Sequence, residues 1–236
     1  LIVIPMSFSE SQYLEFPPRE WSLRWYRNYF ASTAWMQATV TSFQAGALTT
    51  VLATPLGTLA AYGLFASRYR WAHMIHVLMI TPIIVPVILV AIAVFYVYVK
   101  IKLVNSLTGI VLAHSMLAIP LVIMIVTSAL KSYDMNQEMV ARSLGASRAR
   151  AFLGVTLPQI RFAVISSALL AFLTSFDEVV LAMFVSGGGN STLTRNMFLA
   201  LRDQIDPTIA AISTLMIVVT TVLLALSQRF GQTRRG

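Results

Sequence analysis

The chain has 236 residues, of which 57% are hydrophobic and 11% are charged, and its formal net charge is +8. A soluble domain carries roughly 25% charged residues, so this composition excludes an ordinary soluble protein. The chain has no cysteine, which excludes disulfides and thiolate metal sites.

Long uncharged runs define the class of the protein. Residues 28–67, 71–99, 103–130 and 207–228 contain no Asp, Glu, Lys or Arg, and a further run, 159–186, is interrupted only by Arg161, Asp177 and Glu178. Each run can supply the roughly 20 apolar residues that cross a bilayer as a helix. Continuous apolar runs exclude the alternating pattern of a membrane β-barrel. We predict an all-α polytopic membrane protein with a single domain over 1–236 and spans at about 36–66, 72–99, 104–130, 158–185 and 207–229.

The N-terminal segment precedes the first of these runs. Residues 1–4 are aliphatic and are followed by Pro5, which predicts the tail of a sixth span. No basic region or cleavage site indicates a signal peptide. Residues 21–30 combine aromatic and basic side chains, which favours a helix at the outer membrane interface, and an aromatic ligand box is the alternative.

Proline and tyrosine mark the second run. Pro82 and Pro86 lie four residues apart, and proline kinks a helix. Broken helices inside a membrane are tolerated where they are buried in protein or line a water-filled path, and ordinary packing kinks are the other interpretation. Tyr96, together with Phe176 from a later run, could flank a cation through its ring, although Tyr96 also suits an interfacial belt.

The 131–157 segment is a charged island between two spans. Asp134 and Gln137 have the spacing of a capping box, and Gly145 suits the left-handed position that ends a helix. Ser147 can cap a second short helix, and Pro158 suits the first turn of the next span. This pattern predicts a helix–glycine–helix element with Phe152 and Leu153 exposed on it. An ordinary basic loop that contacts lipid headgroups is the alternative.

Two acidic residues, Asp177 and Glu178, interrupt the 158–185 span. Burying a carboxylate in a membrane costs about 2.5 kcal/mol or more, so such groups normally face a cavity, a partner or water. They could offer negative charge to a cationic substrate, or one could pair with an arginine or cap a kink. Adjacent residues of a helix point about 100° apart, so both are not expected to face one pore. We slightly favour Asp177.

The distribution of charge predicts the orientation. Ten basic and two acidic residues fall on one side of the predicted spans, and seven basic and five acidic residues fall on the other. The positive-inside rule places the first set, and with it the 131–157 loop, in the cytoplasm. The basic excess therefore reflects topology rather than nucleic-acid binding. The ten basic residues are Arg68, Arg70, Lys131, Arg142, Arg148, Arg150, Arg161, Arg229, Arg234 and Arg235.

The 138–158 segment resembles the "EAA" loop of binding-protein-dependent ABC importer permeases. In that family a small residue is followed thirteen positions later by proline, with aliphatic residues three and one positions before it. The matching residues here are Gly145, Val155, Leu157 and Pro158. The family glutamate usually lies six residues before the glycine, where this chain has Met139, and Glu138 is one place early. The direct acidic contact is thus in doubt, although Glu138 could substitute after a small rotation.

The resemblance implies that this loop enters a groove on an ATPase subunit. Phe152 and Leu153 would be the apolar anchors, and arginines would form the charged rim. The expected docking residues are Glu138, Ala141, Arg142, Gly145, Arg148, Arg150, Phe152, Leu153 and Pro158. The expected substrate-path residues are Asp177, Glu178, Phe176 and Tyr96.

Nearly the whole chain, 1–230, resembles spermidine/putrescine-type permeases, specifically the second of their two membrane subunits. The residues that carry this resemblance include the 173–187 segment, His114 with Pro120, and Asp206 followed by Pro207. The resemblance implies a bacterial inner-membrane, multi-pass subunit that imports polyamines. Opines, phosphonates or amino-acid-like solutes are alternative substrates, because the group also contains importers of related small amines.

The resemblance also implies the partners, which are a second and different permease subunit, two ATPase subunits, an outer solute-binding protein and membrane lipid. The chain has no Walker A, dinucleotide or His-Glu-x-x-His zinc motif, so we expect no catalysis and no cofactor of its own. ATP and Mg would bind to the ATPase. A secondary transporter driven by an ion gradient is the alternative from another class.

Overall fold

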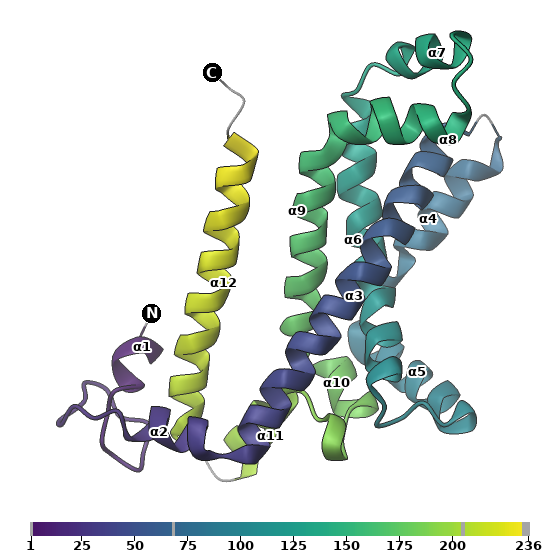
Figure 1. Ribbon diagram of the computed structural model, residues 1–236. Helices are drawn as coiled ribbons and strands as arrows, with labels where there is room; N and C mark the ends of the chain where they lie inside the picture. The colour runs from purple at the N-terminus through teal and green to yellow at the C-terminus, as the bar shows by residue number, and fades with distance from the viewer. Residues whose placement is uncertain (1, 68, 204–205, 233–236) are drawn as a thin grey trace.

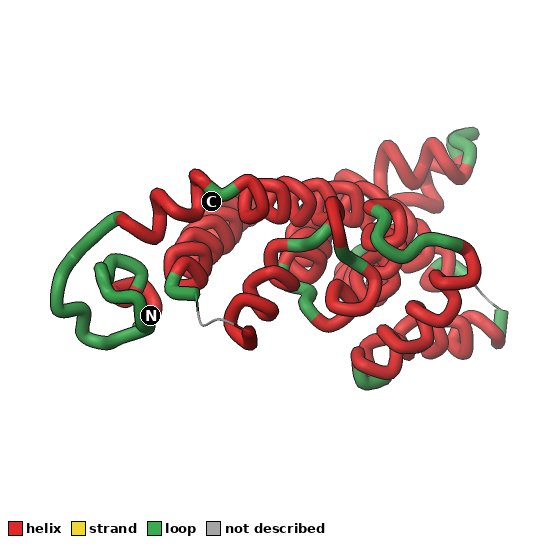
Figure 2. Tube along the Cα trace, turned by 90° about the horizontal axis from the view of Figure 1, so that it is seen from below, coloured by secondary structure: helices red, strands yellow, loops and turns green. Residues whose placement is uncertain are grey.

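The structure is a computed structural model that describes residues 2–67, 69–203 and 206–232, except the side chains of 226–232. In this part of the chain the regular structure is helical, and the one strand-like pairing is an isolated bridge between Ser9 and Trp21 (Figure 2). Four of the described helices are long and apolar enough to cross a membrane, and a bent pair could supply a fifth. The predicted all-α membrane class is confirmed.

The helices follow one another along the whole described chain. The long ones are α3 (Thr33–Phe65), α6 (Leu107–Lys131), α9 (Leu157–Phe176) and α12 (Thr208–Gln232). The bent pair is α4 (Trp71–Ile84) and α5 (Val87–Ile101). The 131–157 loop contains α7 (Asn136–Ser143), α8 (Arg148–Ala151) and the π-helical turn η1 (Phe152–Thr156). The remaining elements are α1 (Val3–Met6), α2 (Arg24–Ala31), α10 (Val180–Val185), η2 (Gly188–Asn190) and α11 (Leu193–Asp203).

Three long helices, α3, α6 and α9, pack against one another in the middle of the molecule (Figure 1). The 131–157 loop covers their upper ends, and α10, α11 and α5 lie at the lower end. Helix α12 stands on the far side of α9 and packs against α9, α1 and α2. The bundle therefore has two distinct ends, joined by the long helices.

Small residues let α3 approach its two neighbours closely. A Cβ added to Gly57 would lie 2.7 Å from Val122 of α6, and one added to Gly46 would lie 2.8 Å from Phe172 of α9. Membrane helices gain little from the hydrophobic effect and associate through close packing of such residues. The buried face of α3 is made largely of them: Ala38, Ser42, Ala45, Gly46, Thr49, Ala53, Gly57, Thr58 and Ala61.

The second predicted span, 72–99, is not one continuous helix. Helices α4 and α5 are bent by 100° relative to each other. Val85 has an extended backbone immediately before Pro86, as the steric demand of the proline ring requires. By contrast, Pro55 and Pro120 lie within α3 and α6, which continue through them.

The predicted span at 158–185 is also interrupted. Its helix, α9, ends at Phe176, and α10 begins only at Val180. The acidic pair therefore lies in a break between two helices instead of inside a continuous span. The interruption follows from the cost of burying charge and from the interactions that Glu178 makes.

The N-terminal predictions have mixed outcomes. The aromatic segment at 21–30 forms α2, with Trp25 and Tyr29 buried and Trp21 exposed. The aliphatic start of the chain contains the single turn α1, and the upstream span stays a prediction. Three residues counted in the charge argument, Arg68, Arg234 and Arg235, lie outside the described residues, as does the side chain of Arg229.

Candidate functional site

Local backbone preferences build the 131–157 loop as expected. Gly145 has φ +94°, and its N–H donates to the Arg142 carbonyl at 3.0 Å, which ends α7. The Ser147 hydroxyl accepts the Arg150 N–H at 3.3 Å at the start of α8. Asp134 accepts the Asn136 N–H at 3.0 Å. Pro158 lies in the first turn of α9. The predicted helix–glycine–helix element is confirmed, and its two helices lie across the upper end of the bundle (Figure 1).

Glu138 is buried beneath this loop and is only 2% exposed. The Tyr62 hydroxyl donates to its Oε1 at 2.5 Å, and the Thr156 hydroxyl donates to its Oε2 at 2.5 Å. Both carboxylate oxygens are therefore engaged within the chain. The expectation that Glu138 could supply a surface contact is wrong, because its position faces α3 and η1.

Phe152 is also buried, at 6% exposure, so its predicted exposure is wrong. Its ring packs on Tyr62 with centroids 4.4 Å apart. Phe152 and Thr156 are four residues apart in η1, so they lie on the same face of this helical segment, and both are buried. Leu153, the next residue, points outward and is 60% exposed.

The exposed surface of the loop is larger than the sequence suggested. Leu144 is 84% exposed, Val140 is 59% exposed and Met139 is 51% exposed. Their spacing in the sequence could have indicated this surface, because Val140 in α7 and Leu144 at its C-terminal end are four residues apart and so lie on the same side of the helix. Arg142, Arg148 and Arg150 are exposed around these side chains, and Ala141 is half-buried. We call Met139, Val140, Leu144 and Leu153, with the three arginines, the loop surface.

The break after α9 separates the roles of the two acidic residues. The Glu178 carboxylate accepts the Leu181 N–H at 2.9 Å and so caps α10, and the Thr194 hydroxyl donates to the Glu178 carbonyl at 3.0 Å. Glu178 thus follows the interpretation in which one acid caps a kink. Asp177 is exposed, and the one ion pair among the described residues joins Arg202 to Asp203 instead.

Two open cavities meet at Asp177. The first, of about 560 Å³, lies between α9 and α12 and is lined by Leu173, Thr174, Asp177, Glu178, Met216, Ile217 and Thr220. The second, of about 510 Å³, is lined by Asp177, Val179, Thr194, Met197, Phe198, Leu201, Ile209, Ser213 and Met216. Asp177 and Met216 belong to both. The carboxylate of Asp177 therefore lies where both cavities combine apolar side chains with a few polar ones.

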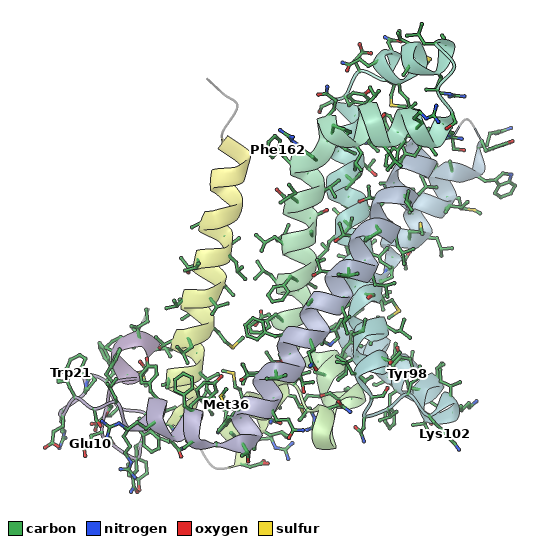
Figure 3. The ribbon with its side chains drawn as sticks, in the orientation of Figure 1. Glu10, Trp21, Met36, Tyr98, Lys102 and Phe162 are labelled. Carbon is green, nitrogen blue, oxygen red and sulfur yellow. The ribbon has the colours of Figure 1, made fainter. Side chains whose placement is uncertain are left out.

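The two aromatic candidates lie elsewhere. Phe176 is 2% exposed and packs against Phe43 and Phe172, with centroids 4.9 and 5.5 Å away, and it lines neither cavity. Tyr96 is on α5, which contributes no residue to either cavity, and Figure 3 places its neighbour Tyr98 on the opposite side of the molecule from α12. Neither residue therefore lines the cavities at Asp177, and their place in the substrate path stays a prediction.

A polar chain that the sequence did not reveal lies one turn before the break. His114 Nδ1 and the Ser175 hydroxyl are 2.7 Å apart, and Ser175 donates to the Thr49 hydroxyl at 3.3 Å. These residues come from α6, α9 and α3, so the chain joins all three central helices close to the end of α9.

Comparison with known proteins decides the family. Residues 53–235 match the family described as "Binding-protein-dependent transport system inner membrane component". The chain belongs to this family. It is therefore a permease subunit of an ABC importer, a non-catalytic component in a system whose ATP is hydrolysed by separate ATPase subunits. This assignment removes the ion-gradient alternative.

Curated relatives of this permease span most of its length. It is 28% identical over 229 residues to the spermidine/putrescine permease PotC of Haemophilus influenzae, covering 97% of this chain and 88% of the relative. It is 32% identical over 204 residues to the putrescine permease PotI of Escherichia coli K12, covering 84% and 73%.

Solved transporters share the permease fold. A bacterial ABC transporter that imports alginate matches with a TM-score of 0.78 and 14% identity, covering 97% of this chain and 88% of that one. The methionine transporter MetNI matches with a TM-score of 0.64 and 15% identity, covering 84% and 97%.

The permease keeps its two candidate sites far apart. The loop surface begins where α9 begins, and the Asp177 cavities begin where α9 ends. A helix of 20 residues with a rise of 1.5 Å per residue separates them by about 30 Å. Any coupling between them must therefore pass through the long helices.

Proposed function

We propose that this permease imports a polyamine or a related small cationic amine, and that the substrate passes Asp177 between α9 and α12. The observation that carries the proposal is a carboxylate with no ion-pair partner among the described residues, shared by two cavities. An unpaired carboxylate at the edge of a membrane bundle is costly unless a cation or water meets it.

The chemistry of the cavity suits such a substrate. A polyamine has protonated amino groups joined by methylene chains, so it needs an anion for its ends and apolar walls for its middle. Asp177 supplies the anion, Thr174 and Thr220 supply hydroxyl oxygens, and Leu173, Met216 and Ile217 supply apolar wall. The names of the relatives, which are spermidine/putrescine and putrescine permeases, support the same class.

We also propose the assembly. The loop surface lies in the cytoplasm and docks onto an ATPase subunit that binds ATP and Mg, and the complex has two ATPase subunits, a second permease subunit and an outer solute-binding protein. Apolar side chains and arginines that are exposed together on this loop support the docking role, because apolar anchors with charged neighbours are typical of protein interfaces. A related alginate transporter is described in complex with a periplasmic protein.

The test is uptake of radiolabelled putrescine and spermidine by the assembled transporter in proteoliposomes. Asp177→Asn should lower transport efficiency by about 10- to 100-fold, since a hydrogen bond to a charged group contributes about 1.5–3 kcal/mol. The matched control is Asp203→Asn, which removes an exposed carboxylate whose one ion pair within the described part of the chain is with the adjacent Arg202. Unchanged uptake by Asp177→Asn would remove Asp177 from the path.

Competition identifies the substrate in the same assay. Unlabelled putrescine, an opine, a phosphonate and an amino acid are compared at equal concentration, with and without ATP. Selective competition by the diamine supports the proposal, and selective competition by another solute replaces the polyamine assignment.

A further inference from the structure

Glu138 is the one buried residue of α7. The rest of this helix faces outward, with Met139 and Val140 more than half exposed. A helix that buries a single carboxylate and few apolar groups gains little from packing. The position of α7 relative to the bundle therefore depends strongly on the hydrogen bonds that Glu138 makes.

These hydrogen bonds connect α7 to two long helices at once. Tyr62 lies in the last turn of α3, and Thr156 is the residue immediately before α9. Each donates its hydroxyl to a different oxygen of Glu138, at 2.5 Å. Hydrogen bonds to a carboxylate are stronger and more directional than those between neutral groups.

The Tyr62 ring makes further contacts with the same loop. Phe152 of η1 packs on it, and the Arg148 guanidinium of α8 lies 5.5 Å from its centroid. One side chain of α3 thus contacts α7, α8 and η1. We call Tyr62, Glu138 and Thr156 the loop tie.

We infer that Glu138 is a positioning residue that transmits movement of α7 to α3 through Tyr62 and to the start of α9 through Thr156, and is not itself an ATPase contact. This inference rests on the proposed docking of an ATPase to the loop surface. A displaced α7 pulls on α3 and on the start of α9, because the buried Glu138 carboxylate is held by Tyr62 of α3 and by Thr156, the residue directly before α9. Without the tie, the loop can move while α3 stays in place.

The test uses variants that remove only hydroxyl groups. Tyr62→Phe and Thr156→Val each delete one donor to Glu138 and keep most of the side-chain volume. Matched controls are Tyr133→Phe and Thr127→Val, whose hydroxyls are buried and have no hydrogen-bond partner in the described part of the chain. Glu138→Gln is a further variant that keeps the shape and removes the charge.

Three quantities are measured on the purified complex: retention of the ATPase subunits, the rate of ATP hydrolysis, and substrate taken up per ATP hydrolysed. We expect the double variant Tyr62→Phe/Thr156→Val to retain the ATPase and hydrolyse ATP, while uptake per ATP falls by roughly fivefold or more. In each single variant, uptake per ATP should fall by less, and in both controls it should match that of the unmodified complex.

A structural readout accompanies this assay. Spin labels are introduced through Gln137→Cys on α7 and Val51→Cys on α3, because the chain has no cysteine of its own. In the unmodified complex the distance distribution should stay narrow with and without ATP. In the double variant it should broaden, since α7 no longer follows α3.

The possible outcomes distinguish a failure of this inference from a failure of the proposed ATPase docking. Unchanged uptake per ATP in the double variant and in Glu138→Gln overturns the inference and leaves the docking proposal standing. Loss of the ATPase from Glu138→Gln, with the controls intact, also overturns it, because Glu138 then acts in docking itself. An unmodified complex that holds no ATPase on the loop overturns the proposed function.

Discussion

Phe152 and Leu153 are adjacent in the sequence and have opposite environments. The Phe152 ring packs on Tyr62 inside the bundle, and Leu153 is 60% exposed. The two acidic neighbours also differ, because Glu178 caps α10 and lines one cavity, while Asp177 makes no such cap and lines both cavities. At the scale of single residues, one step along the chain separates a side chain held by the fold from one that is free to meet a ligand or a partner.

This contrast predicts two different kinds of defect. Phe152→Ala should destabilise the permease by about 3–5 kcal/mol, because it leaves a cavity beside Tyr62. Leu144→Asp should leave the isolated permease as stable as before and should release the ATPase, since this side chain is 84% exposed. Thermal unfolding of the isolated permease and co-purification of the ATPase check the two effects. Intact co-purification of Leu144→Asp would contradict the docking surface.

Two elements illustrate how backbone chemistry shapes the bundle. Helix α3 stays continuous through Pro55, whereas α4 and α5 part at Pro86, which bends the run by 100°. Helix α9 ends where its carboxylates begin, and the polar chain through His114 joins it to α3 and α6 just before that point.

Close packing along α3 can be tested with two glycines of the same helix. Gly57→Ala places a methyl group 2.7 Å from Val122 and should cost about 1–3 kcal/mol of stability through overpacking. Gly63→Ala meets no atom within 4 Å and should be neutral or stabilising, because alanine favours the helix. Thermal unfolding of both variants in the same detergent checks the difference. Equal stability of the two would argue against a tight α3–α6 contact.

The whole molecule carries one candidate site at each end of its long helices. The 131–157 loop lies at the upper end, and the α9–α10 break and Lys102 lie at the lower end (Figure 3). Arg142, Arg148 and Arg150 gather at the loop, which agrees with the positive-inside rule for a cytoplasmic loop. The loop tie and α9 then provide a continuous route between the ends.

Orientation can be measured directly, because introduced cysteines would be unique in this chain. Gln137→Cys should resist a membrane-impermeant maleimide in intact spheroplasts and react after the membrane is opened. Lys102→Cys should react in both states, since it lies at the opposite end of the bundle. The reverse pattern would place the loop outside and exclude docking to a cytoplasmic ATPase.

The sequence by itself determined the membrane class, the approximate positions of the helical regions and the helix–glycine–helix order of the 131–157 loop. These depend on composition and on local backbone preferences, such as the positive φ of Gly145 and the cap that Ser147 provides for α8, although the capping box predicted at Asp134 does not form, since α7 begins after Met135 without a side-chain cap. They are properties of a few neighbouring residues, and a pattern can report them.

Only the tertiary structure decided which side chains face inward. Tyr62 and Glu138 are 76 positions apart in the sequence and are joined by a hydrogen bond. Because of this contact, Glu138 is buried instead of lying at the surface as expected. The cavities at Asp177 likewise require residues of α12, which lies beyond α10 and α11 in the chain. Burial depends on which helices pack together and on which face each helix turns toward its neighbours. The spacing of residues along the sequence predicts neither.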